Sequence, residues 1–395
     1  MKHYNFDQVI NREDSNAVKW NQLNKHFHFD GDDGLALWVA DMDFACAEVI
    51  VEAIIKRATH PIYGYGDEDD KQYDGAIINW FKRRFDWEIE ANNIFFAPGV
   101  VPAISFIIQA LSKHGDGIII QSPVYYPFAK KILNNNRVVV NNPLVRKNGA
   151  YTIDFVDLEN KMKLPHVKGM ILCSPHNPVG RVWHEDELKH VVAIASKYHK
   201  WIISDEIHGD LIRNGHHHLP LVKCCPEYRN EIITCTAPSK SFNLAGLQNS
   251  NIIIYNNDYI EAWNKIVVEQ ASLSKCNTFA RDATIAAYDQ GERWLDECNA
   301  YIDDNFEFLK KYLSEHCPKA IVTECEGTYL AWVDFSYYVK SNDELKHLMI
   351  QKAHVILDEG IMFGEEGSLF ERINMACPQS VLKKALSRIV NVLGN

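Results

Sequence analysis

The sequence of 395 residues lacks long hydrophobic runs, an excess of basic charge, internal repeats and low-complexity tracts. Its longest apolar stretches, such as residues 103–111, are far too short to cross a bilayer. The first fourteen residues hold three acidic side chains and no apolar core, so we expect neither a secretory nor a transit peptide. The formal net charge of −11 argues against a protein that binds nucleic acid or an anionic membrane, because either would require a basic face.

The ten cysteines are scattered and show no spacing typical of a disulfide framework. The adjacent Cys224 and Cys225 cannot easily share a disulfide, and the histidine run 216–218 has no metal-ligand spacing. We therefore expect free thiols in a reducing compartment, a cytoplasmic location and no bound metal.

The length of the chain favours two domains, since it exceeds what one compact core usually holds. The middle of the chain alternates apolar runs with helical patterns. Near-continuous runs of Val, Ile and Leu are typical of strands buried on both faces, which predicts an α/β fold with a mostly parallel, doubly wound sheet. The expected strands are Ile94–Phe96, Gly117–Gln121, Arg137–Asn141, Gly169–Ser174, Trp201–Ser204, Ile232–Thr236 and Asn251–Tyr255.

The pattern changes beyond about residue 280. Asp282–Leu313 has few helix breakers and predicts one long helix, which a strand, a helix, a strand and a closing amphipathic helix follow. We therefore expect a large α/β domain at residues 46–284. The smaller α+β domain is expected to combine residues 1–45 with residues 285–395.

Three polar side chains follow predicted strands at their carboxyl ends. Asn177 follows the strand in GMILCSPHNPVG, Asp205 closes KWIISDE, and Lys240 comes shortly after Ile232–Thr236. Ligands of open α/β sheets bind at this edge. An amine for a Schiff base, a carboxylate for a pyridinium nitrogen and an amide for a phenolic oxygen together suit pyridoxal phosphate.

The other groups that this cofactor needs also have candidates. The segment FAPGVVPAI places the backbone N–H groups of Val100 and Val101 at a helix start, where an anion binds well. Ser239 adds a hydroxyl beside Lys240. An aromatic side chain of SPVYYPF, Tyr125 or Tyr126, would lie over the ring; the alternative is that both tyrosines only pack near a turn.

A substrate carboxylate also has a candidate partner. Arg372 lies on a predicted buried strand, where a guanidinium needs a bidentate anion, and the carboxylate of an amino acid fits. The alternative is an internal ion pair with an acid such as Glu371. His208, three residues after Asp205, is either close to the cofactor or a structural histidine.

Together these motifs resemble a known family. The chain is similar to the fold type I pyridoxal-phosphate enzymes of aminotransferase class I and II. Within them it resembles the carbon–sulfur lyase branch, which contains cystathionine β-lyases, the bacterial maltose-regulon modulator and cystalysin. The similarity runs nearly end to end and is carried by LWVADMDF, YGYGDED, APGVVPAI, SPVYYPF, SPHNPVGRVW, SDEIHGDL, APSKSFNLAGL, EGTYLAWVDF and ERINMACP.

The resemblance implies a role for each candidate residue. Lys240 would bind the cofactor and act as the catalytic base, Asp205 would hold the pyridine nitrogen and Asn177 the phenolic oxygen. Tyr125 would stack on the ring and assist proton transfer. The remaining roles concern the phosphate, which Val100, Val101 and Ser239 would hold, and the substrate, which Arg372, Asn177 and Tyr126 would bind.

The resemblance further implies a homodimer with shared active sites, since Tyr65 of the YGYG loop would reach the phosphate across the interface. The implied reaction is α,β-elimination on L-cystathionine or a related sulfur amino acid, which yields homocysteine or sulfide, pyruvate and ammonia. An aminotransferase would use the same residues, and a regulatory protein that binds a transcription factor is a third interpretation. Which sulfur amino acid is preferred stays open.

Overall fold

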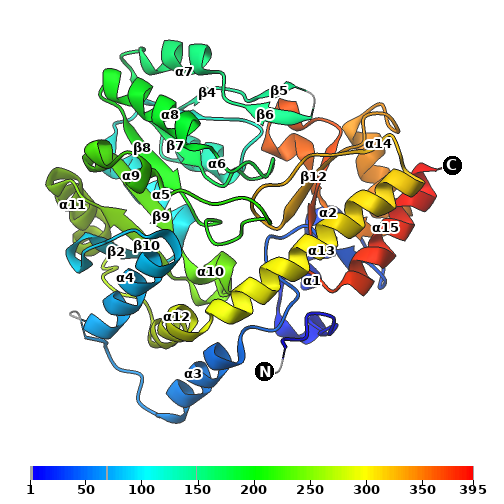
Figure 1. The fold of residues 1–395 in the computed structure, drawn as a ribbon, viewed down its shortest axis with the longest axis horizontal. Coiled ribbons are helices and arrows are strands. Elements are labelled where there is room, and N and C mark those ends of the chain that lie inside the picture. Colours follow the sequence, from blue (N-terminus) through cyan, green and yellow to red (C-terminus); the bar gives the residue numbers. More distant parts are fainter. Residues whose placement is uncertain (1–2, 68–69, 148, 395) are drawn as a thin grey trace.

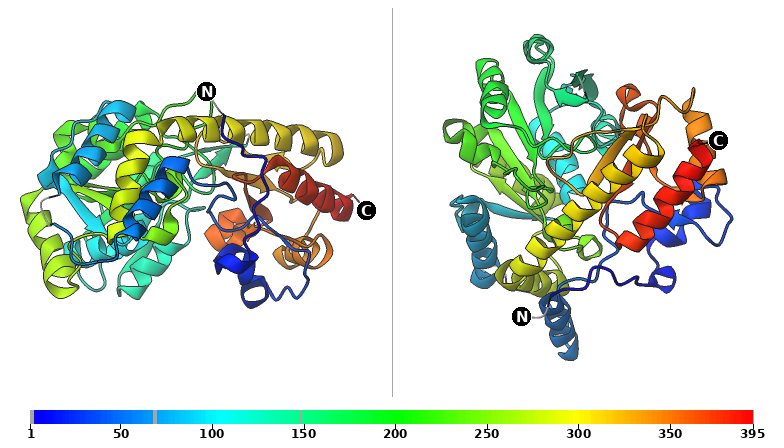
Figure 2. Two further views of the ribbon diagram at one scale, coloured as in Figure 1. Left: turned by 90° about the horizontal axis from the view of Figure 1, so that it is seen from below. Right: turned by 45° about the vertical axis from the view of Figure 1, so that its right-hand side comes forward.

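The computed structural model describes residues 3–67, 70–147 and 149–394, which form two lobes around two main β-sheets (Figure 1). The larger lobe holds a seven-stranded sheet and the smaller lobe a four-stranded sheet. Helix α13 (Glu292–His316) extends from the larger lobe to the smaller one, where it lies beside α15 (Gln379–Leu393) (Figure 2).

The seven-stranded sheet is mostly parallel, as the apolar runs predict. Its strand order is β2-β10-β9-β8-β7-β3-β4, with parallel pairs from β9 to β4, whereas β10 runs antiparallel to both β9 and β2. Every predicted strand of this sheet is present, close to its expected bounds: β2 (Ile94–Ala97), β3 (Gly117–Ile120), β4 (Val138–Asn141), β7 (Val167–Cys173), β8 (Trp201–Asp205), β9 (Ile232–Thr236) and β10 (Ser250–Ile254).

Both faces of this sheet are buried, because successive side chains of a strand point to opposite faces. Ile118 and Ile120 of β3 pack in one apolar cluster, and Ile119 between them packs in the other. Helices α5 (Val100–Leu111), α6 (Pro127–Asn134) and α11 (Asn257–Asn264) cover the first face. The second face is covered by α4 (Lys71–Phe85), α7 (Phe155–Met162), α8 (Glu185–Lys197) and α12 (Thr278–Gln290).

The four-stranded sheet of the smaller lobe is antiparallel, in the order β11 (Ile321–Val322), β12 (Leu330–Asp334), β15 (Phe370–Asn374) and β14 (Asp358–Glu359). The amino-terminal arm joins this lobe, because β1 (Leu35–Ala36) pairs in parallel with β13 (Val355–Ile356). The remaining α-helices and strands of the described residues are α1 (Val18–Asn21), α2 (Leu23–Phe27), α3 (Glu48–Thr59), β5 (Val145–Lys147), β6 (Ala150–Thr152), α9 (Leu221–Cys224), α10 (Pro238–Ser241) and α14 (Asn342–Lys346).

The prediction of one long helix over Asp282–Leu313 is wrong. Two helices, α12 and α13, meet at Gly291. A Cβ atom at this position would lie 2.5 Å from the backbone oxygen of Ala287 and 2.7 Å from the ring of Phe242. The close approach at this corner therefore requires glycine, and the helix changes direction there.

We propose to keep the domain boundaries that the sequence predicts, with residues 46–284 as the large domain and residues 1–45 and 285–395 as the small one. The positions of the two sheets and of the β1–β13 pair support this division. None of the helices within the described ranges combines the length and the apolar character that crossing a membrane requires.

Candidate active site

A cavity of about 180 Å³ opens at the carboxyl ends of β7, β8 and β9. A more open groove of about 930 Å³ lies between α4 and α13, but the residues that line it include none of the predicted site residues. The smaller cavity is therefore the candidate site. Seven of the ten predicted residues line it: Val100, Val101, Tyr125, Asn177, Asp205, Ser239 and Lys240.

Lys240 lies on α10, a single helical turn that begins with Pro238 just after β9. Its amine donates a hydrogen bond to the backbone oxygen of Ala40. Burial and the positive charge of Arg372 lower the pKa of Lys240 to about 8, although Asp41 and Asp205 act in the opposite direction. A useful fraction of this amine is therefore neutral near physiological pH, as a nucleophile or a general base must be.

Asp205 ends β8, and its side chain is 4% exposed. One carboxylate oxygen accepts a hydrogen bond from the backbone N–H of Ile207 at 3.2 Å. Burial raises the pKa of Asp205 to about 7, and the neighbouring charge of Glu206 also raises it. A cationic ring placed in the cavity would stabilise the ionised carboxylate, because burial is costly for an unpaired charge.

The orientation of the Asn177 amide follows from its contact with Arg372. The Nη1 atom of Arg372 lies 3.1 Å from Oδ1 of Asn177. A guanidinium carries only donors, so the amide oxygen must face it. The amide N–H groups of Asn177 are then left to donate to a ligand in the cavity.

Arg372 does not line the cavity, but it lies directly behind Asn177 on β15. It forms an ion pair with Asp358, which stands opposite it on β14, and its Nη2 also donates to the backbone oxygen of Trp38 at 2.8 Å. Arg372 therefore pairs with Asp358 and not with Glu371, the acid that the sequence suggests. Glu371 is the neighbour of Arg372 on β15, and adjacent side chains of a strand point to opposite faces. These contacts leave N–H donors of the guanidinium for a substrate.

The two predicted tyrosines occupy different places. Tyr125 lines the cavity, and burial raises the pKa of its hydroxyl, so the group remains a proton donor. Tyr126 lies outside the cavity lining. The Tyr126 ring packs edge-to-face on Phe363 at 5.5 Å, and the guanidinium of Arg372 lies over the Phe363 ring at 4.9 Å. Tyr126 and Arg372 thus pack on the same phenylalanine.

The start of α5 forms one end of the cavity. Gly99 precedes this helix with a φ of 124°, a conformation that side chains with a Cβ rarely adopt. The N–H groups of Val100 and Val101 follow at the first turn, where backbone donors lack partners within the helix and the helix dipole favours an anion. Ser239 lines the same cavity and adds a hydroxyl. This end suits a phosphate.

Several groups at the cavity are not among the predicted site residues. Gln248 and Asn249 line it and end the motif NLAGLQN. The Asn249 amide already donates to Tyr73 and Thr284, so Gln248 is the further carboxamide donor that the sequence makes visible. His208 also lines it; its buried Nδ1 has no hydrogen-bond partner among the described residues. Burial, with the charges of Lys240 and Arg372, holds the pKa of His208 well below its ordinary value, so the ring is neutral.

Tyr65, the last of the predicted residues, also lies outside the cavity lining. It is fully exposed in the loop after α3 and does not line the cavity of its own chain. A role at the site would therefore have to involve a second copy of the chain.

Comparison with known proteins identifies the family. The family model described as aminotransferase class I and II matches residues 32–389. The chain belongs to this family.

Among its relatives, cystathionine beta-lyase PatB of Bacillus subtilis (strain 168) is 40% identical over 385 residues, which cover 98% of each chain. The solved structure of cystalysin from Treponema denticola, which contains a pyridoxal 5'-phosphate cofactor, matches with a TM-score of 0.96 and 37% identity, over 100% of this chain and 99% of that one. The PLP-bound C-S lyase from Staphylococcus hominis matches with a TM-score of 0.93 and 36% identity, over the same shares. The predicted fold type I is confirmed.

The lowered pKa of Lys240 predicts how its reactivity depends on pH. In cofactor-free protein, acylation of Lys240 should rise with pH through a midpoint near 8, because only the neutral amine reacts. At pH 8, an ordinary lysine has only about one amine in 300 neutral. Peptide-level mass spectrometry after brief acylation at a series of pH values measures this dependence.

Lys197 is the matched control, because its exposed amine has a pKa raised by the hydrogen bond to Glu159. Acylation of Lys240 only at the high pH at which Lys197 reacts would contradict the prediction.

Proposed function

We propose that the protein is a pyridoxal-phosphate-dependent carbon–sulfur β-lyase that acts on L-cystathionine or a related sulfur amino acid. The products are a thiol (homocysteine or sulfide), pyruvate and ammonia. The observation that carries this proposal is the convergence of Lys240, Asp205 and Asn177 on one cavity. The similarity to cystathionine beta-lyase PatB over 98% of the chain supports the reaction class.

The residues at the cavity fit pyridoxal phosphate by their chemistry. When bound, the cofactor supplies an aldehyde that takes up the substrate amino group and a ring that withdraws electrons from Cα. Lys240 would hold the aldehyde, and Asp205, at the end of β8, would keep a proton on the ring nitrogen. Asn177 would donate to the phenolic oxygen, and Tyr125 would pack against the ring. Val100, Val101 and Ser239 would hold the phosphate.

The side chains move two protons during the reaction: one leaves Cα, and one is given to the departing sulfur. The Lys240 amine is the base that takes the proton from Cα. The Cβ–S bond then breaks, and the sulfur leaves with a proton from Lys240 or Tyr125. With water, the rest of the substrate becomes pyruvate and ammonia. Arg372, Asn177 and Tyr126 hold the substrate carboxylate so that the Cα–H bond faces the Lys240 amine.

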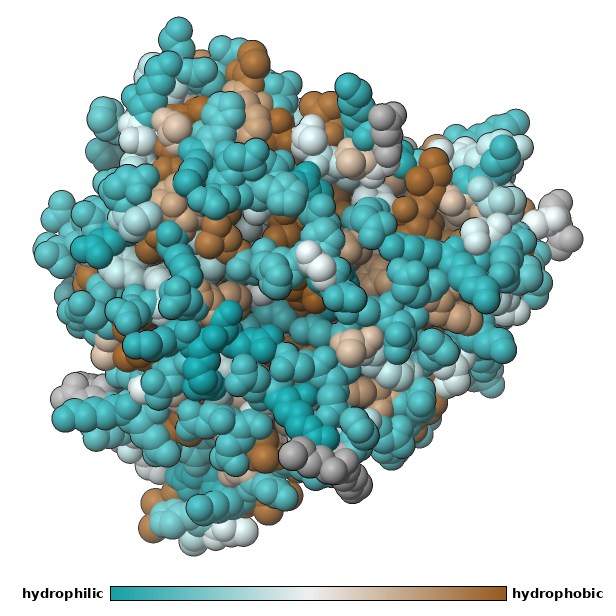
Figure 3. Space-filling view, in the orientation of Figure 1, coloured by the Kyte–Doolittle hydropathy of each residue, from teal (hydrophilic) through white to brown (hydrophobic). Residues whose placement is uncertain are grey.

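A homodimer and a cytoplasmic location complete the proposal. Exposed apolar side chains on α3 and the loop after it, Val51, Ile55, Ile62 and Tyr65, support a protein partner on this surface. The lower end of the molecule, where α3 lies, shows apolar side chains among polar ones (Figure 3). A reducing cytoplasm is supported by the ten cysteines, all of which are free thiols.

The central test separates elimination from transamination. Purified holoenzyme should release pyruvate from L-cystathionine in equal amount to homocysteine, without any added 2-oxo acid. Lys240→Ala should lower this rate by about 10²- to 10⁴-fold, because the base that takes the Cα proton is gone. Turnover that begins only when a 2-oxo acid is supplied would identify an aminotransferase and contradict the lyase.

Arg372→Lys should raise KM by about tenfold to a hundredfold with a smaller effect on kcat, because the bidentate hold on the carboxylate is lost. Steady-state kinetics with L-cystathionine measures both constants. Arg146→Lys is the control, since Arg146 pairs with Asp334 of the small sheet and neither residue lines the cavity. An unchanged KM in Arg372→Lys would remove this arginine from the substrate site.

The shared site predicts complementation between two inactive variants. Tyr65→Ala should weaken cofactor binding, and Lys240→Ala should remove the base. When both chains are co-expressed, the mixed dimer contains one site with an intact lysine from one chain and an intact tyrosine from the other. Recovery of activity toward one half of the wild-type value per dimer is expected after co-purification with two tags, because one of the two sites of each mixed dimer is intact. Absence of recovery in an isolated mixed dimer would contradict the action of Tyr65 across the interface.

A further inference from the structure

The loop formed by residues 38–44 supplies hydrogen-bond acceptors to both cations of the candidate site. The backbone oxygen of Ala40 accepts a hydrogen bond from the Lys240 amine. The backbone oxygen of Trp38 accepts one from Nη2 of Arg372 at 2.8 Å. Because one short loop provides both acceptors, its position helps to set where the amine and the guanidinium point.

The loop is joined directly to the turn that carries Lys240. Asn243, three residues after Lys240, accepts a hydrogen bond from the backbone N–H of Met42 at 3.0 Å and donates one to the backbone oxygen of Met42 at 3.0 Å. The hydroxyl of Tyr329 donates to the oxygen of Ala40 at 2.7 Å. The Lys240 amine therefore shares its acceptor with a fixed tyrosine.

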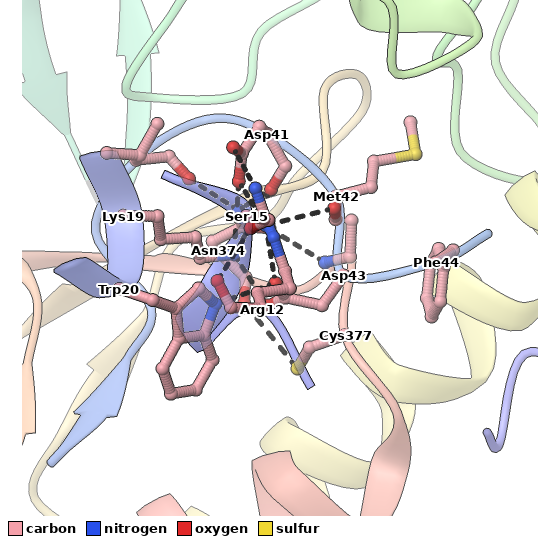
Figure 4. Close-up of polar contacts among 12 residues, drawn as sticks. Arg12, Ser15, Lys19, Trp20, Asp41, Met42, Asp43, Phe44, Asn374 and Cys377 are labelled. Atoms are coloured by element: carbon pink, nitrogen blue, oxygen red, sulfur yellow. Dashed lines mark hydrogen bonds and ion pairs between the residues drawn. The ribbon is translucent and has the colours of Figure 1, made fainter. Parts of the chain in front are cut away.

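On its other side the loop is held by cations of the amino-terminal arm (Figure 4). Lys19 is fully buried, and its amine lies 2.7 Å from Oδ2 of Asp43 and 3.2 Å from the backbone oxygen of Asp41. Arg12 bonds to Oδ1 of Asp43 at 2.7 Å and to Oδ2 of Asp41 at 2.8 Å. Asp43 also accepts from the indole N–H of Trp20 at 3.0 Å. One carboxylate thus receives donors from three side chains of the arm.

Burial makes this arrangement rigid. A buried ammonium is very costly without a carboxylate beside it, so the loop cannot move away from Lys19 without leaving that charge unpaired. Asn374 adds hydrogen bonds of 2.7 Å to the backbone oxygens of Val39 and Asp41. Hydrogen bonds that share partners in this way hold one another in place. Arg12, Lys19 and Asp43 themselves do not line the cavity.

We propose that Asp43, held by Lys19 and Arg12, is a positioning residue for Lys240: it fixes the Ala40 oxygen that receives the Lys240 amine, both at rest and when the amine is released during the reaction. This inference rests on the proposed function, because the released amine exists only if Lys240 holds the cofactor. The amino-terminal arm would then support the catalytic step without touching substrate or cofactor.

The consequence for the reaction is a change in the pH profile. The charged groups around Lys240 are Arg372 from β15, Asp205 from β8 and Asp41 from the loop, while His208 at the cavity wall is neutral. A fixed oxygen acceptor and the nearby Asp41 favour the ammonium form of Lys240. If the loop loosens, the pKa of Lys240 falls, and the acidic limb of kcat moves to lower pH as the amine becomes poorly directed.

The test uses holoenzyme and compares two arginines that tie down the amino-terminal arm. Arg12→Gln removes the partly exposed cation at Asp43 and leaves the Lys19–Asp43 pair in place. It should lower kcat by about threefold to tenfold, shift the acidic limb to lower pH and retain the cofactor absorbance. Arg12→Lys should restore most of the wild-type kcat and most of the wild-type pH profile. Arg388→Gln is the control, because Arg388 ties the arm through Asp33, at 2.8 Å, away from the loop.

Asp43→Asn is the second variant. In folded protein it should move the acidic limb of kcat to lower pH by more than Arg12→Gln does. Equal effects of Arg12→Gln and Arg388→Gln, or an unchanged pH profile in Arg12→Gln, would overturn the inference while leaving the lyase intact. A wild-type protein without cofactor absorbance or pyruvate release would instead overturn the proposed function, on which the inference rests.

Discussion

The hydrogen bond from the Lys240 amine to the Ala40 oxygen joins the two lobes of the protein. Lys240 follows a strand of the large sheet, and Ala40 follows the strand that ties the amino-terminal arm to the small lobe. The contact between Arg372 of the small sheet and Asn177 of the large lobe spans the same boundary. The cavity therefore exists only where the lobes meet, and burial at that boundary determines the charge state of its groups.

Burial shifts the two central groups in opposite directions. It lowers the pKa of Lys240 to about 8 and raises the pKa of Asp205 to about 7, because a buried site disfavours the charged form of each. The lysine becomes reactive, and the aspartate gains from a cationic partner. A cofactor that carries an aldehyde and a basic ring nitrogen suits both groups: the aldehyde reacts with the neutral Lys240 amine, and the protonated ring pairs with Asp205. Both pKa shifts therefore fit the proposed lyase.

The sequence predicts the large sheet and the convergence of Lys240, Asp205 and Asn177, because parallel strands share one carboxyl edge and each of these side chains follows a strand. It does not predict that the Ala40 oxygen accepts a hydrogen bond from Lys240, because every residue has a backbone oxygen and no side chain identifies this one. Nor does it predict Asp358 beside Arg372, which depends on pairing with a strand of two residues. Long-range contacts of this kind follow from packing.

The most direct test of the account is to find where the cofactor is attached. Purified protein saturated with pyridoxal phosphate is reduced with borohydride, digested and analysed by mass spectrometry, which locates the stable pyridoxyl group that the reduction leaves. The account predicts one modified residue per chain, Lys240, in the peptide that contains APSKSFN. A pyridoxyl group on another lysine, or an unmodified Lys240 in saturated protein, would contradict it.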